Sequence, residues 1–80
     1  MTDGEAWATI AAAFDKDTAI HEDVLTALLR AERNVDPITA TASLDDLVNA
    51  KVLSITVMAR DPPQRWYRRA RRGSPPAEQR

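Results

Sequence analysis

The hydrophobic periodicity of this chain changes once, near residue 50, and that change limits the folds available to it. Before this point apolar residues recur every three or four positions, which is the spacing of one face of an α-helix. From residue 53 to residue 60 they alternate with other side chains, and the stretch is rich in β-branched residues, as in a strand with one buried face. We therefore expect an α+β domain in which the helices precede the strands.

Three helices are expected before the change of period. In residues 5–14 the large side chains Trp7, Ile10 and Phe14 fall on one helical face, which predicts an amphipathic helix. Asp3 is expected to cap this helix, because a side-chain oxygen at that position accepts a backbone N–H. The spacing assigns Trp7 and Phe14 to the core, whereas an exposed Trp7 would indicate a dimer surface.

The second and third helices are separated by only three residues. The second covers residues 22–33 and ends at Asn34, which tolerates the left-handed conformation common at a helix C-terminus. The third covers residues 37–50, with Asp36 as its cap and Pro37 in its first turn. A connection this short predicts a tight helix-turn-helix corner.

The apolar stripes of these two helices define the expected core. They consist of Val24, Leu25, Leu28 and Leu29 in the second helix and of Ile38, Leu44, Leu47 and Val48 in the third. Five residues are expected to be almost fully buried: Leu28, Leu29, Leu44, Leu47 and Ile55. At the end of the third helix, Lys51 stands where glycine would suit a left-handed conformation, and we expect it to adopt that conformation at a modest cost.

The alternating segment is expected to be the first strand of a two-stranded antiparallel hairpin. Residues 61–64 include two prolines, which cannot join a strand ladder, so they are expected to form the turn. A four-residue turn sets Arg60 opposite Arg65, which makes Trp66 face inward and Tyr67 face outward. The inward face of this hairpin then holds Ile55, Val57 and Trp66.

The remaining segments complete the expected organisation. Residues 18–20 are compatible with a stub of extended chain. The folded domain is expected to cover residues 1–70, and residues 71–80, which contain no large apolar side chain, are expected to form a basic, proline-containing, disordered tail. The chain has 80 residues in all, which suits a single small domain.

The net charge of −1 conceals opposite charges in the two halves of the chain. Residues 1–50 contain ten acidic and three basic side chains, whereas residues 51–80 contain eight basic and two acidic ones. This asymmetry indicates an anionic partner at the basic end, although attraction between the two ends of the fold would also explain it. The densest basic cluster is Arg68, Arg69, Arg71 and Arg72, for which phosphate binding and a solvated tail are the two interpretations.

The composition excludes several classes of site. There is no cysteine, so a disulfide framework and a cysteine-based zinc site are excluded. The one histidine, His21, precedes Glu22 and Asp23, and these neighbours diverge on a helix, so we expect a helix start rather than a metal site. The sequence has no glycine-rich phosphate loop and no nucleophile–histidine–acid set, so we expect neither enzymatic activity nor a cofactor.

The cellular setting is predicted from what the sequence lacks and from its composition. No apolar run approaches the ~20 residues of a membrane span, and the N-terminus has no signal pattern. We therefore expect a cytoplasmic protein. The many arginines and alanines and the few lysines are typical of a GC-rich prokaryotic or phage genome.

In its order of parts the chain resembles the winged helix-turn-helix family. The resemblance covers residues 5–70 and is most specific over residues 37–53, where a small, polar helix start leads to Leu44 and Leu47 at the family's Leu-x-x-Leu spacing. Trp66 and the residues after it are similar to the aromatic and basic return strand of the wing. The fold that this resemblance implies is three helices followed by a two-stranded wing.

The resemblance implies a small DNA-binding transcriptional regulator, acting as a homodimer on two half-sites. In such proteins the third helix enters the major groove and basic side chains around it hold phosphates. The residues of this chain that match those positions, or add basic charge near them, are Arg30, Arg33, Thr39, Thr41, Ser43, Arg60, Arg65, Tyr67, Arg68, Arg69, Arg71 and Arg72. Tyr67 is included because an outward tyrosine among arginines can stack on nucleic acid, and ordinary packing within the wing is the alternative interpretation of this side chain.

The third helix also supports an alternative of another class. Ala42 stands where many relatives carry a long polar side chain, no lysine or arginine lies within residues 37–50, and Asp45 and Asp46 would repel phosphates. A neutral or acidic third helix suits a winged-helix module that docks a partner protein. The position of the arginines in the fold distinguishes the two functions. Arginines on the same face as Thr39, Thr41 and Ser43 favour DNA binding, whereas an acidic face there favours docking of a protein.

Overall fold

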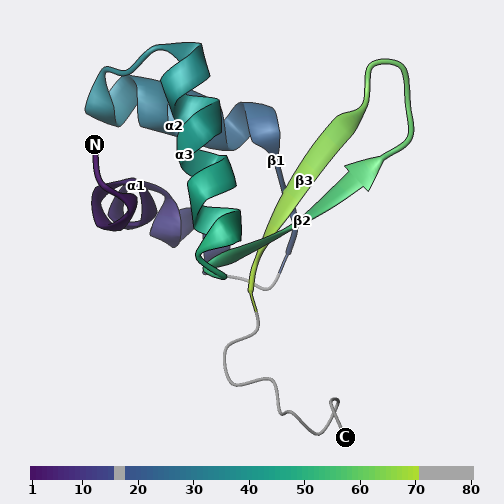
Figure 1. Ribbon diagram of the computed structural model, residues 1–80, viewed down its shortest axis with the longest axis horizontal. Helices are drawn as coiled ribbons and strands as arrows, with labels where there is room; N and C mark the ends of the chain where they lie inside the picture. The colour runs from purple at the N-terminus through teal and green to yellow at the C-terminus, as the bar shows by residue number, and fades with distance from the viewer. Residues whose placement is uncertain (16–17, 71–80) are drawn as a thin grey trace, which may run out of the picture.

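The computed structural model describes residues 1–15 and 18–70. Along this part of the chain the elements are α1 (Asp3–Ile10), the 3-10 helix η1 (Ala11–Phe14), β1 (Ile20–His21), α2 (Glu22–Arg33), α3 (Pro37–Asn49), β2 (Leu53–Met58) and β3 (Gln64–Arg69). The three α-helices gather on one side of the sheet, and the β2–β3 hairpin projects away from them (Figure 1). The α+β class and the order of helices before the hairpin are therefore as predicted. The expected tail, residues 71–80, lies outside the described residues.

Hydrogen-bonding side chains cap the start of each α-helix. Thr2, not Asp3 as expected, caps α1, because its hydroxyl accepts the Glu5 N–H at 3.1 Å while the Glu5 carboxylate accepts the Thr2 N–H at 2.8 Å. His21 caps α2, since its Nδ1 accepts the Asp23 N–H at 3.0 Å, and this confirms its expected role at a helix start. The Asp36 carboxylate accepts the Thr39 N–H at 3.1 Å and so caps α3.

The corner between α2 and α3 is as predicted. Asn34 adopts the left-handed conformation, with φ 55°, and ends α2. Pro37 lies in the first turn of α3, where its missing N–H would have had no helical partner. Lys51 is also left-handed, with φ 67°, so the expectation that a residue other than glycine would carry this conformation is confirmed.

The sheet of the described chain has three antiparallel strands rather than the two expected. Their order is β1-β3-β2, so the return strand β3 lies in the centre. The third strand is the short segment before α2, where Ile20 pairs with Tyr67 and His21 pairs with Trp66. Two residues of alternating pattern are too few to distinguish a strand from a loop, which is why the sequence showed no more than an extended stub.

The register of the hairpin differs from the predicted one, and the difference exchanges the two faces of β3 while β2 keeps the predicted ones. Ile55 pairs with Tyr67, and Thr56 pairs with Trp66. The strands end at Met58 and resume at Gln64, so the connection has five residues instead of four. The predicted pairing lies three residues away from the observed one, and an odd shift turns every side chain of β3 to the other face relative to β2. Tyr67 therefore faces the helices, and Trp66 faces away from them.

The core lies between the helices and the inner face of the sheet. Its fully buried large side chains are Ile10, Leu25, Leu29, Leu44, Leu47, Leu53 and Tyr67. Of the five residues expected to be almost fully buried, Leu29, Leu44 and Leu47 are confirmed, while Leu28 and Ile55 are only partly buried against the core. Trp7 is also partly buried, with its ring stacked on Phe14 at 5.8 Å between centroids.

Three apolar residues that the pattern assigned to the core are exposed. Ile38 at the start of α3 is 78% exposed, Val57 near the tip of the hairpin is 55% exposed, and Val24 in α2 is 51% exposed. Ile38 and Val24 lie in the first turns of their helices. Val57 is the last residue but one of β2, in the hairpin that projects away from the helices (Figure 1). The periodicity identifies which face of a helix or strand is apolar. It does not show which residues at the ends of that face are left uncovered by neighbouring elements.

Candidate nucleic-acid interface

The sheet has one face turned away from the helices, which we call the open face. A hollow of about 390 Å³ on this face is lined by Ala19, Thr56, Met58, Arg60, Gln64, Trp66 and Arg68. Met58 is 40% exposed, Trp66 is partly exposed, and both arginines are exposed. An exposed apolar surface flanked by two guanidinium groups, with no acidic residue in its lining, is chemically suited to an anionic partner with a flat or apolar part.

The floor of this hollow is held in place by His21. The His21 and Trp66 rings meet edge to face, with centroids 5.0 Å apart and an angle of 83° between the ring planes. Because Nδ1 accepts the capping hydrogen bond, Nε2 carries the proton and donates to the Gln64 side-chain oxygen. The Gln64 amide then donates to the Pro62 carbonyl at 3.0 Å. One histidine therefore connects the start of α2, the indole of the open face and the loop of the hairpin.

Arg65 lies on the opposite face of the hairpin and is paired with an acid. Its Nη1 is 3.6 Å from Glu22 Oε2, and the same carboxylate oxygen accepts a hydrogen bond from the Tyr67 hydroxyl at 3.4 Å. Tyr67 itself is 0% exposed, so the expectation that it faces outward to stack on nucleic acid is wrong. Arg65 and Tyr67 therefore lie in one cluster with Glu22 on the helix-facing side of the sheet and not on the open face.

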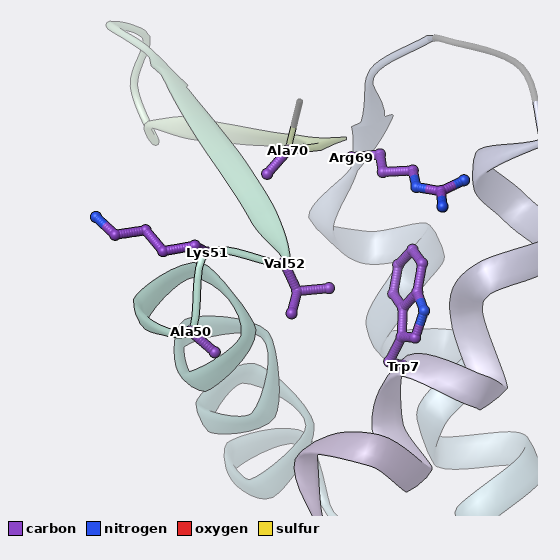
Figure 2. A pocket seen from close by; sticks show the side chains of 6 residues that line it. All are labelled: Trp7, Ala50, Lys51, Val52, Arg69 and Ala70. Atoms are coloured by element: carbon purple, nitrogen blue, oxygen red, sulfur yellow. The ribbon is translucent and has the colours of Figure 1, made fainter. Parts of the chain in front are cut away.

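Two further arginines contact the N-terminal helix. The Arg33 guanidinium donates to the Thr9 hydroxyl at 2.8 Å and to the Glu5 carbonyl at 3.4 Å, which connects α2 to α1. The Arg69 guanidinium lies over the Trp7 ring, 5.7 Å from its centroid (Figure 2). These contacts join α1 to the rest of the fold, so both arginines have a structural task besides any contact with a ligand.

A second hollow, of about 380 Å³, lies where Arg69 covers Trp7. It is lined by Trp7, Ala50, Lys51, Val52, Arg69 and Ala70. Figure 2 shows Val52 directed toward the indole, whereas the Lys51 side chain points away from it. Since Arg69 already covers the indole and Lys51 points outward, the two cations do not converge on one point in this hollow.

The face of α3 that is expected to read bases carries no cation. A shallow hollow of about 420 Å³ along this helix is lined by Pro37, Ile38, Thr41, Ala42 and Asp45. Asp45 and Asp46 are both exposed, as is Thr39, whereas Thr41 is partly buried and Ser43 is buried. Ser43 is therefore turned into the protein and not toward a ligand, contrary to expectation.

Acidic side chains lie near Tyr67 on the helix-facing side of the hairpin. Burial, reinforced by the nearby Glu22 and Asp45 carboxylates, raises the pKa of Tyr67 from 10.0 to about 12. Both carboxylates disfavour a phenolate, whereas the nearby Arg65 guanidinium favours it, so these three charged groups leave one net negative charge near the Tyr67 hydroxyl. The open face, by contrast, has only basic residues among the charged side chains of its hollow.

The pKa of Tyr67 gives a spectroscopic prediction. The chain has one tyrosine, so phenolate absorbance near 295 nm reports on this side chain alone. We expect a midpoint near pH 12 in the folded protein and near pH 10 in urea. Because the folded-state pKa is the higher one, the contribution of Tyr67 to stability is complete below pH 10 and is lost as the pH rises from 10 to 12. A folded-state midpoint at pH 10 would contradict the burial of this hydroxyl.

The structure thus divides the predicted site residues into groups. It brings Arg60 and Arg68 to one hollow, directs Arg33, Arg65 and Arg69 into contacts within the fold, and leaves Arg30 exposed near the end of α2. Arg71 and Arg72 lie outside the described residues. The open-face residues that the prediction missed are Thr56, Met58, Gln64 and Trp66, and the signal that would have found them is the parity of the strand register.

Two other features are absent from the described part of the chain. Among residues 1–15 and 18–70, no three histidine or acidic side chains are grouped so as to hold a metal ion. Within the same residues no helix is long and apolar enough to cross a bilayer. Comparisons with family models, curated proteins and solved structures found no significant match to this chain.

Proposed function

We propose that the protein is a winged-helix protein that binds duplex DNA through its phosphates, using the open face of the β2–β3 hairpin. The element order α1-β1-α2-α3-β2-β3, the three-residue corner before α3 and the projecting hairpin support the winged-helix assignment (Figure 1). The observation that carries the DNA-binding function is the hollow in which Arg60 and Arg68 flank Trp66. Guanidinium groups pair well with phosphate oxygens because their donors form a rigid, planar fork.

The proposal differs from the usual mode of the family in the role of α3. Its exposed surface offers Ile38, Ala42 and Asp45 and no cation, so it lacks the donors that most often read guanine. Attachment through phosphates depends little on base sequence. We therefore propose that the hairpin provides most of the affinity and that discrimination between duplex sequences is weak.

A nuclear magnetic resonance titration with a short duplex tests this assignment. At low salt we expect the backbone amide signals of residues 56–60 and 64–68 to shift on addition of DNA, while those of residues 38–49 stay in place. Signals that shift mainly in residues 38–49 would show instead that α3 enters the groove. Inorganic phosphate, added separately, serves as a control for weak anion binding at any exposed arginine.

A second function, docking of a partner protein, is favoured by the surface of α3. Ile38 is 78% exposed and is followed on the same face by Ala42 and Asp45. An exposed isoleucine with a carboxylate on the same helix face suits contact with a basic, partly apolar partner. If no duplex binds even at low salt, the docking function becomes the better proposal.

A further inference from the structure

The outer edge of β2 has no partner in the described part of the chain. In the order β1-β3-β2, the central strand β3 is paired on both sides, whereas β2 is paired with β3 only. Such an edge presents a row of backbone donors and acceptors that can pair with another strand. This feature is independent of the proposed DNA-binding function.

The sequence of β2 lacks the usual protection of an edge strand. Proteins prevent unwanted pairing with lysines, prolines, bulges or very short edge strands. The strand Leu53–Met58 has six residues without a charge, a proline or a glycine, and its Cα pairing with β3 is continuous. Its neighbour β3, by contrast, contains three arginines. The unprotected strand is thus the one that lies at the edge.

The hydrogen bonds of β2 show which of its backbone groups point outward. The Val52 carbonyl accepts the Ala70 N–H at 3.0 Å, so this carbonyl points toward the return strand, whereas the Val52 N–H donates to the Leu47 carbonyl at the end of α3. These groups alternate in direction along an antiparallel strand. Leu53, Ile55 and Val57 therefore direct theirs to the free edge.

We propose that β2 pairs with β2 of a second copy of this chain, forming an antiparallel, two-fold symmetric dimer with a continuous six-stranded sheet. Outward-pointing residues must meet each other, and the two-fold register that pairs all three of them sets Ile55 opposite Ile55 of the second copy and Leu53 opposite Val57. Lys51 then lies opposite Ala59, so no like charges face each other across the axis. A second copy suits this edge because the uncharged strand complements itself in this register.

The dimer has a consequence for the surface of the sheet. A two-fold axis that relates two side-by-side antiparallel strands is perpendicular to the sheet and keeps each face on its own side. The two open faces therefore form one surface, on which Arg60, Trp66 and Arg68 of each copy are repeated. Val57, 55% exposed in the single chain, gains a neighbour on the helix-facing side.

Replacing Val57 with proline tests the pairing with little change to the hairpin. The Val57 N–H points to the free edge, so Val57→Pro removes a donor from the edge but none from the ladder to β3. Val57→Ala, which shortens the same side chain but keeps the N–H, is the matched control. In sedimentation or light-scattering measurements, we expect the parent and Val57→Ala to show twice the mass of one chain at high concentration, and Val57→Pro to show the mass of one chain throughout.

Cross-linking provides a second test that does not depend on the proline. The proposed register sets Ser54 opposite Thr56 of the second copy in a pair without mutual backbone hydrogen bonds, where side chains lie closest. The chain has no cysteine, so Ser54→Cys combined with Thr56→Cys should oxidise to a covalent dimer, whereas Ser54→Cys alone should not. A parent protein that is monomeric at every concentration, a Val57→Pro variant that dimerises like the parent, or assembly beyond two chains would overturn the proposal.

Discussion

Tyr67→Ala is expected to lower the free energy of unfolding by about 3–5 kcal/mol, as truncation of a buried aromatic side chain does. Tyr67 is fully buried in the centre of the sheet, between Ile20 on β1 and Ile55 on β2. A domain of this size has a total stability near the low end of about 5–15 kcal/mol, so the variant should be largely unfolded at moderate temperature. Urea denaturation followed by circular dichroism measures the change.

Trp66→Ala is the matched control for this prediction. Trp66 precedes Tyr67 on the same strand, but it lies on the open face and its ring contacts that of His21. Its removal should cost about 1 kcal/mol, which is the scale of one aromatic contact. The reverse order, with Trp66→Ala the more damaging of the two, would contradict the register Ile55–Tyr67 and favour the pairing expected from a four-residue turn.

Local signals in the sequence were sufficient for the helices and their corner. Asn34, Asp36 and Pro37 each have a chemical preference for the position that they occupy, and these preferences act within a few residues along the chain. The amphipathic stripe of α2 was correct in part, since Leu25 and Leu29 are fully buried, whereas Leu28 is partly buried and Val24 is exposed. Helix boundaries and caps depend on neighbours in sequence, so most of them could be found from the sequence; the exception is the start of α1, which Thr2 caps in place of Asp3.

The sheet depended on contacts that the sequence does not reveal. Tyr67 pairs with Ile20, almost fifty residues earlier, and this pairing places the hydroxyl beside Glu22. The buried centre of a three-stranded sheet sets the register here, and the proline turn adapts to it with five residues instead of four. Because the turn was expected to have four residues, the prediction turned Trp66 inward and Tyr67 outward. It therefore included Tyr67 in the candidate site and omitted Trp66.

The candidate site was predicted in part for the same reason. The hairpin arginines were identified from charge alone, and Arg60 and Arg68 do line one hollow. The sequence could not show that Arg65 pairs with Glu22 or that Arg69 covers Trp7, because those contacts join segments that are distant in the chain. It did show that α3 has no cation, and the exposed Asp45 and Asp46 agree with that interpretation.

Arg60→Ala combined with Arg68→Ala is expected to have the largest effect on DNA binding among variants of the described residues. Each bound phosphate releases counterions, so the slope of log affinity against log salt changes by about 0.9 for every phosphate that the protein no longer neutralises. Removal of both arginines should flatten the slope by about 1.8 and weaken binding to all duplexes alike. Arg30→Ala removes one positive charge from an exposed position at the end of α2 and is the control for loss of an arginine outside the open face.

The salt dependence of binding to a random duplex, compared among the parent, the double variant and Arg30→Ala, tests the role of the open face most directly. Fluorescence anisotropy at several salt concentrations gives the three slopes. Phosphate attachment through the hairpin predicts a slope close to that of the parent for Arg30→Ala and a slope flatter by about 1.8 for the double variant. A double variant that keeps the affinity and slope of the parent, while Arg30→Ala loses both, would contradict it.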